Sequence, residues 1–114
     1  MRSALIVDDH AEFRAAARTL LEAGGFAVAE AADGRSAVAA VATFHPDLVL
    51  LDVQLPDLDG FSVAELLAGR SEVVLISSRP ASSYRGRLAV TSAAGFLTKS
   101  ELTLSALTAL LAPP

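Results

Sequence analysis

The fold of this chain is decided by the stretch Leu48-Val49-Leu50-Leu51-Asp52, four aliphatic residues that end in an acid. Such a run is typical of a strand that is buried on both faces of a parallel sheet. A second run of the same kind, Ala4-Leu5-Ile6-Val7, is followed by Asp8 and Asp9. Functional groups at the carboxyl ends of parallel strands converge in the crevice where α/β proteins bind ligands. We therefore expect these three carboxylates to lie together.

A third short run, Gly95-Phe96-Leu97-Thr98, adds a cation to this acidic group, because Lys99 follows it directly. Carboxylates within a few ångströms of one another raise one another's pKa, so the cluster needs compensating charge. A divalent cation would remove the repulsion, and a nearby ammonium would hold the anion that the cation attracts. The combination predicts a phosphorylation switch.

Strand and helix patterns alternate five times with short connections, which predicts an α/β fold with a parallel sheet. The predicted strands are residues 4–7, 26–31, 48–52, 73–77 and 95–98. The predicted helices are residues 11–23, a helix from an Asp33 cap to about Phe44, residues 61–68, and a last helix that carries Leu104, Leu107, Leu110 and Leu111. Between Ser82 and Ala94 a marginal helix and a plain loop fit equally well, because Gly86 and nearby serines weaken a helix there.

Composition limits the classes of protein to which the chain can belong. Its 114 residues predict a single domain over residues 1–114, and the sequence Ala112-Pro113-Pro114 cannot continue a helix. No cysteine is present, which fits a cytoplasmic protein, and no apolar run approaches the roughly 20 residues that cross a bilayer. The net charge is −4 and no basic run occurs, so we expect this domain to make no direct contact with nucleic acid.

Taken in order, the polar residues at the predicted strand ends resemble those of a response-regulator receiver (CheY-like) domain over the whole chain. The resemblance rests on Asp8-Asp9, Asp52-Val53-Gln54-Leu55-Pro56-Asp57-Leu58-Asp59-Gly60, Ser77 and Lys99. It implies a doubly wound, five-stranded parallel sheet of order 2-1-3-4-5 with helices on both faces. The run Lys99-Ser100-Glu101-Leu102 is similar to receivers that are joined to helix-turn-helix output domains.

The resemblance implies a role for each residue of the acidic cluster. Asp52 would accept a phosphoryl group from a sensor histidine kinase or phosphotransfer protein, and Lys99 would pair with a phosphoryl oxygen. Asp9 and Asp52 would bind Mg²⁺ directly, Asp8 through water, and Gln54 through its backbone carbonyl. Such a domain acts in signalling and is not an enzyme, since it promotes only its own phosphorylation and dephosphorylation.

The resemblance also implies a switch beside the acidic cluster. Ser77 would donate a hydroxyl hydrogen bond to the phosphoryl group, and Phe96 matches an aromatic position whose rotamer follows that movement. Ser78 is an alternative donor, and Phe96 is equally well explained as plain core. Phosphorylation would change partner binding, including self-association through the fourth helix, fifth strand and last helix.

Several positions depart from the family pattern or leave its reading open. Many family members have proline after the lysine, whereas Ser100 stands there and is predicted to cap the last helix. The stretch between Asp52 and Ser77 is short for the family, which predicts a third helix of at most two turns. We do not expect His10 to be a metal ligand or a phosphorylation site. A solvated rim or partner surface is predicted for Arg79, Tyr84, Arg85 and Arg87.

Two other functions fit the same residues. A pseudo-receiver would keep the fold and bind partners without phosphorylation. An aspartate-nucleophile phosphohydrolase would use the same carboxylates and Mg²⁺, but Gln54 stands where such an enzyme has its second acid. Phosphorylation of Asp52 separates a working receiver from the first alternative, and turnover of a small phosphate ester would identify the second.

Overall fold

A five-stranded parallel sheet of order β2-β1-β3-β4-β5 forms the centre of the computed structural model, which describes residues 2–111. The strands are β1 (Ser3–Val7), β2 (Ala27–Ala31), β3 (Leu48–Asp52), β4 (Glu72–Ser77) and β5 (Gly95–Thr98). Each neighbouring pair is parallel, so the predicted fold class and strand order are confirmed. The strand order reverses beside β1 and β3, which is where such sheets bind ligands. The predicted helix-breaking end, residues 112–114, lies outside the described residues.

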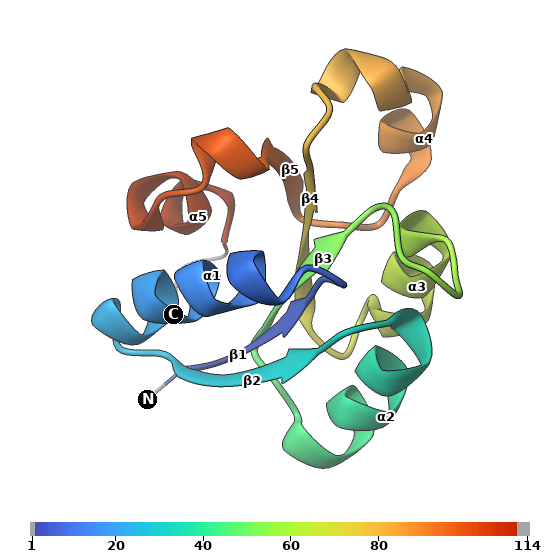
Figure 1. Ribbon diagram of the computed structural model, residues 1–114. Helices are drawn as coiled ribbons and strands as arrows, with labels where there is room; N and C mark the ends of the chain where they lie inside the picture. Colours follow the sequence, from blue (N-terminus) through green and yellow to red (C-terminus); the bar gives the residue numbers. More distant parts are fainter. Residues whose placement is uncertain (1, 112–114) are drawn as a thin grey trace.

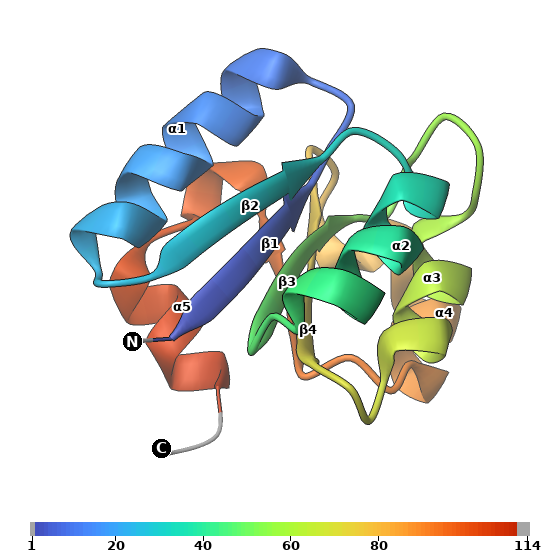
Figure 2. The same ribbon diagram turned by 90° about the horizontal axis from the view of Figure 1, so that it is seen from below.

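Helices cover both faces of the sheet (Figure 1, Figure 2). One face carries α1 (Ala11–Ala23) and α5 (Leu104–Leu110), and the other carries α2 (Gly34–Phe44), α3 (Gly60–Leu67) and α4 (Arg85–Val90). Two 3₁₀ turns, η1 (Ala81–Tyr84) and η2 (Lys99–Glu101), precede α4 and α5. Among residues 2–111, no helix combines the length and the apolar character needed to span a bilayer.

The central strand β3 explains why its sequence has no polar alternation. Leu48 and Leu50 pack in the core beneath α1 and α5, while Val49 and Leu51 pack in the core beneath α2 and α3. All four side chains are fully buried. Because both faces of the strand are covered, every position is apolar until Asp52 ends it.

Local sequence signals set the ends of the first two helices as expected. Gly25, just after α1, has a positive φ of 89°, a conformation that glycine adopts without a steric penalty. The Asp33 side chain caps α2 by accepting a hydrogen bond from the Ser36 N–H at 2.8 Å. At the other end of α2, His45 is left-handed and immediately precedes Pro46, so the helix ends where predicted.

In the second half of the chain, one predicted helix cap is wrong and the choice between helix and loop for residues 82–94 is resolved. The N-cap of α5 is Thr103, whose side chain accepts the Ala106 N–H at 3.0 Å, so the prediction that Ser100 caps this helix was wrong. The segment between Ser82 and Ala94 contains a short helix, since η1 leads into the six-residue α4. The helix α3 has eight residues, a little over two turns and close to the predicted length.

Candidate functional site

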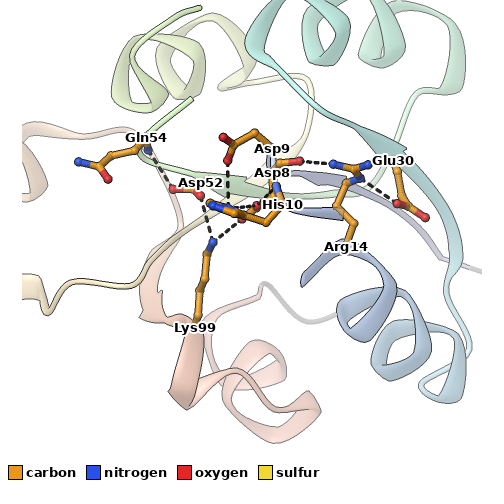
Figure 3. A network of polar contacts seen from close by, with 8 residues as sticks. All are labelled: Asp8, Asp9, His10, Arg14, Glu30, Asp52, Gln54 and Lys99. Carbon is orange, nitrogen blue, oxygen red and sulfur yellow. Dashed lines mark hydrogen bonds and ion pairs between the residues drawn. The ribbon is translucent and has the colours of Figure 1, made fainter. Parts of the chain in front are cut away.

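Four charged side chains that lie far apart in the sequence meet at the carboxyl edge of the sheet (Figure 3). Asp8 and Asp9 follow β1, Asp52 ends β3, and Lys99 follows β5. Asp8 is fully buried and Asp52 is 5% exposed, whereas Asp9 is open to solvent. Two of the three carboxylates of the site are therefore buried, and the third, that of Asp9, is exposed to solvent.

Lys99 connects the two buried carboxylates. Its Nζ lies 2.6 Å from Asp8 Oδ2 and 3.2 Å from Asp52 Oδ2. The same ammonium lies 4.6 Å from the centroid of the Phe13 ring, so α1 supplies a second attractive surface for it. Burial lowers the pKa of Lys99, but the carboxylates of Asp8 and Asp52 outweigh that effect and leave the pKa above its ordinary value. The ammonium is therefore held charged against both acids.

The buried position of Asp52 disfavours the charged form of its carboxyl group. Its Oδ1 accepts the backbone N–H of Gln54 at 2.9 Å, and its Oδ2 contacts Lys99. Burial raises the pKa of Asp52 to about 6, and the Gln54 N–H and the ammonium do not offset the combined effect of burial and the neighbouring Asp8. A cation brought to this carboxylate would relieve the repulsion.

Asp8 shows the opposite behaviour. Burial raises its pKa, but Lys99 and the backbone N–H of His10 outweigh that effect and leave the pKa below its ordinary value. The His10 N–H donates to Asp8 Oδ1 at 2.7 Å, which fixes the carboxylate at the start of α1. The surroundings of Asp8 thus favour its charged form, and its carboxylate holds Lys99 in place.

Oxygen ligands suited to a hard divalent cation gather at the same place. One ligand atom from each of Asp8, Asp9, His10 and Asp52 lies within 4.8 Å of the others. The Nδ1 atom of His10 lies 3.0 Å from an oxygen of Asp8 and 3.0 Å from an oxygen of Asp9. From the sequence we did not expect His10 to be a metal ligand, yet its ring lies among the carboxylates. The three aspartates fit Mg²⁺, which prefers carboxylate oxygens and retains water.

The loop after β3 is shaped by a close backbone approach. The Gly60 N–H donates to the Val53 carbonyl at 3.0 Å, and a Cβ at Gly60 would overlap the backbone of Asp52 and Val53. Asp59 caps α3 by accepting the Ser62 N–H, and Asp57 accepts the Gly34 N–H at 2.8 Å. Both acids are used in structural contacts, so of this loop's carboxylates only Asp52 faces Lys99.

Ser77, at the end of β4, is buried and its hydroxyl is already engaged. Its Oγ lies 2.9 Å from the Tyr84 hydroxyl and accepts the Arg79 N–H at 3.0 Å. The prediction that Tyr84 belongs to a solvated rim was wrong, because its half-buried ring lies between Phe61 and Phe96. The side chains of Arg79, Arg85 and Arg87 are exposed as expected. Phe96 is half-buried, and its role in a switch stays a prediction.

Sequence reasoning also missed two residues that brace the site. Arg14 of α1 donates from Nη1 to the Asp8 carbonyl at 2.7 Å and from Nε to Glu30 at 3.0 Å (Figure 3). Arg18, one turn later, donates to the other Glu30 oxygen at 2.7 Å. Helical spacing places the two arginines on one face, but only the parallel pairing of β1 with β2 brings Glu30 to them.

Comparison with known proteins agrees with this geometry. A family model described as "Response regulator receiver domain" matches residues 4–112. A putative transcriptional regulator of Pseudomonas aeruginosa is 35% identical over 105 residues, which is 89% of this chain and 51% of that protein. The chain thus spans about half the length of this relative.

Solved structures of similar proteins have the same fold. The signal receiver domain of the putative response regulator NarL from Mycobacterium tuberculosis has a TM-score of 0.78 and 31% identity, covering 96% of this chain and 95% of that one. The chemotaxis response regulator CheY4 of Vibrio cholerae has a TM-score of 0.85 at 23% identity, covering 97% and 99%. Since the sheet order, the residues at the strand ends and the family match agree, the chain belongs to the receiver-domain family of two-component response regulators.

Proposed function

We propose that residues 1–114 form a single phosphoacceptor receiver domain in which Asp52 takes a phosphoryl group from a sensor histidine kinase or phosphotransfer protein. The observation that carries this proposal is the placement of the Asp52 carboxylate. It lies 3.2 Å from the Lys99 ammonium, in a cluster that also contains the carboxylates of Asp8 and Asp9. A nucleophile and a fixed cation at one point are the parts that phosphoryl transfer needs.

In the proposed reaction an Asp52 oxygen attacks the phosphorus atom of a phosphohistidine. The new P–O bond forms as the P–N bond breaks, and the electron pair of the P–N bond returns to the imidazole nitrogen. The product is an acyl phosphate on Asp52. Lys99, which Asp8 and the Phe13 ring hold in place, would shift from the Asp52 carboxylate to a phosphoryl oxygen.

Mg²⁺ is the proposed cofactor, and its ligands would be the residues named from the sequence. Asp9 and Asp52 would bind it directly, Asp8 through water, and Gln54 through its backbone carbonyl. When bound, the ion would neutralise the carboxylates and the phosphoryl oxygens. Asp8 remains with Lys99 in this arrangement, since its Oδ2 is the oxygen nearest the ammonium.

Phosphorylation is proposed to change protein contacts, with no further enzymatic activity. The proposed output is partner binding, including a phosphorylation-dependent homodimer through α4, β5 and α5. With a net charge of −4, this domain is not proposed to bind nucleic acid directly. A cytoplasmic location is proposed because the sequence contains no cysteine, which fits a reducing compartment.

The experiment is intact-mass measurement after incubation with acetyl phosphate and Mg²⁺. We expect one phosphate adduct on the parent, none on Asp52→Asn, and none when EDTA removes the metal. Asp57→Asn is the matched control and should keep the adduct, because its carboxylate accepts the N–H groups of Gly34 and Arg35 at the start of α2.

Two outcomes of this experiment would contradict the proposal. A folded parent without an adduct would favour the pseudo-receiver, which binds partners independently of phosphate. Steady release of phosphate from a small ester, lost in Asp52→Asn, would favour the phosphohydrolase.

A further inference from the structure

The Tyr84 hydroxyl lies where the switch of a phosphorylated receiver would have to act. Tyr84 ends η1, the turn that links β4 to α4. Its hydroxyl lies 2.9 Å from Ser77 Oγ, and its ring centroid lies 5.7 Å from that of Phe61 and 5.9 Å from that of Phe96. Tyr84 therefore connects the end of β4 with α3 and β5 through one side chain.

The hydrogen-bonding capacity of Ser77 makes this contact consequential. A hydroxyl has one hydrogen to donate and two lone pairs to accept. One lone pair is used by the Arg79 N–H at 3.0 Å, and the side chain is only 2% exposed, so solvent offers little alternative. A buried donor hydrogen without an acceptor is unfavourable. Either hydroxyl of the Ser77–Tyr84 pair could be the donor, and we assign Ser77 as the donor because its other contact, with the Arg79 N–H, offers no acceptor.

The segment that carries Tyr84 is weakly attached elsewhere. Neither η1 nor α4 contains a buried residue, and only Tyr84 and Leu88 of residues 81–90 are half-buried. A second tie runs from α4 through Arg87, which pairs with Asp59 and lies 4.4 Å from the Phe61 ring. Because residues 81–90 have so few buried contacts, loss of the Tyr84 hydrogen bond would loosen the whole segment.

Resting on the proposed function, we propose that Tyr84 is a positioning residue that holds the Ser77 hydroxyl until a phosphoryl group on Asp52 takes it. In the unphosphorylated protein Ser77 donates its hydrogen to the Tyr84 oxygen. A phosphoryl oxygen is the stronger acceptor, because it is charged. When the Ser77 hydroxyl turns toward that oxygen, the Tyr84 oxygen loses the hydrogen that Ser77 donated, and the contact that ties η1 and α4 to the end of β4 is broken. Phe96 cannot perform this step, since it has no hydroxyl.

The contact itself is tested by fluorescence without any ligand. Tyr84 is the single tyrosine of the chain and there is no tryptophan, so tyrosine emission reports on this residue alone. We expect Ser77→Ala to change the Tyr84 emission and Ser78→Ala, at the exposed neighbouring position, to leave it unchanged. Equal emission from the parent and both variants would overturn the proposal.

The coupling is tested with beryllofluoride and Mg²⁺ as a phosphoryl mimic, by calorimetry and by hydrogen exchange. Tyr84→Phe keeps the ring and removes only the competing hydroxyl, so we expect it to bind the mimic about two- to tenfold more tightly than the parent. We also expect its residues 81–90 to exchange, without the mimic, as fast as those of the mimic-bound parent.

The outcomes separate this inference from the proposed function. A parent that binds the mimic through Asp52, with Tyr84→Phe unchanged in affinity and exchange, would overturn the role of Tyr84 and leave the receiver function standing. A folded parent that does not bind the mimic would overturn the receiver function and this inference with it.

Discussion

The carboxyl ends of β1 and β3 are packed much more tightly than the segment that follows β4. Asp8 is fully buried, and residues 48–53 are all buried. In contrast, η1 and α4 contain no buried residue, and the four residues of β5 are half-buried. Elements with few buried contacts open at low free-energy cost. Asp52, the proposed phosphoacceptor, therefore lies on a well-buried support, whereas Tyr84 and Phe96 lie on elements with few buried contacts.

The largest effect that can test this difference is a cavity in the rigid part. Leu50→Ala removes a fully buried side chain from the central strand, and we expect a loss of about 2–5 kcal/mol in the free energy of unfolding. Val90→Ala, at the end of α4 where the side chain is 80% exposed, should change it by less than about 0.5 kcal/mol. Urea unfolding measures both, and similar losses would show that the two regions are not packed differently.

A matched pair of glycine substitutions tests the same difference through smaller expected changes in the free energy of unfolding. Gly60→Ala places a Cβ against the backbone of Asp52 and Val53, so we expect a loss of about 1–3 kcal/mol in the free energy of unfolding and a displaced Asp52. Gly86→Ala in α4 meets nothing within 4 Å, and it should stabilise the protein by up to about 1 kcal/mol. Thermal unfolding reports both signs. Equal destabilisation by the two would mean that α4 is as constrained as the loop after β3.

The smallest expected effect is electrostatic and depends on pH. The pKa of Asp52 is raised by burial to about 6, above the roughly 3.9 of an unfolded chain, so its charged form opposes folding. The resulting penalty is absent below about pH 4, grows between about pH 4 and about pH 6, and stays constant at higher pH. Without metal, the stability of Asp52→Asn relative to the parent should therefore increase over this range, by on the order of 1 kcal/mol and at most about 3.

Asp47→Asn is the control with the opposite sign. The Ser3 N–H holds the pKa of Asp47 below its ordinary value, so this carboxylate stabilises the folded protein at neutral pH. Asp47→Asn should be less stable than the parent at pH 7, and the difference should shrink in acid. Denaturant unfolding at several pH values follows both variants, and parallel pH curves for the two would contradict the assignment of the buried charge.

Residues in regular local patterns were predicted well, and residues whose role depends on distant partners were not. The run before Asp52 is apolar at every position because both faces of β3 are covered. The sequence pattern alone therefore identifies it as a buried strand. The Asp33 cap and the left-handed glycine after α1 are equally local. Ser100 shows the limit, because Thr103 offers the same chemistry three residues later and the start of α5 selects between them.

The order of the elements and the meeting of Asp8, Asp9, Asp52 and Lys99 follow from the amino-acid sequence alone, since each residue follows or ends a strand of one parallel sheet. Which groups surround them depends on how the helices and loops pack around that sheet. Phe13 beneath Lys99, Glu30 beside Arg14 and Tyr84 against Ser77 are contacts between elements whose spacing has no periodic signature. Hydrophobic periodicity specifies which face of an element is buried, whereas side-chain partners across elements depend on how those faces are packed together.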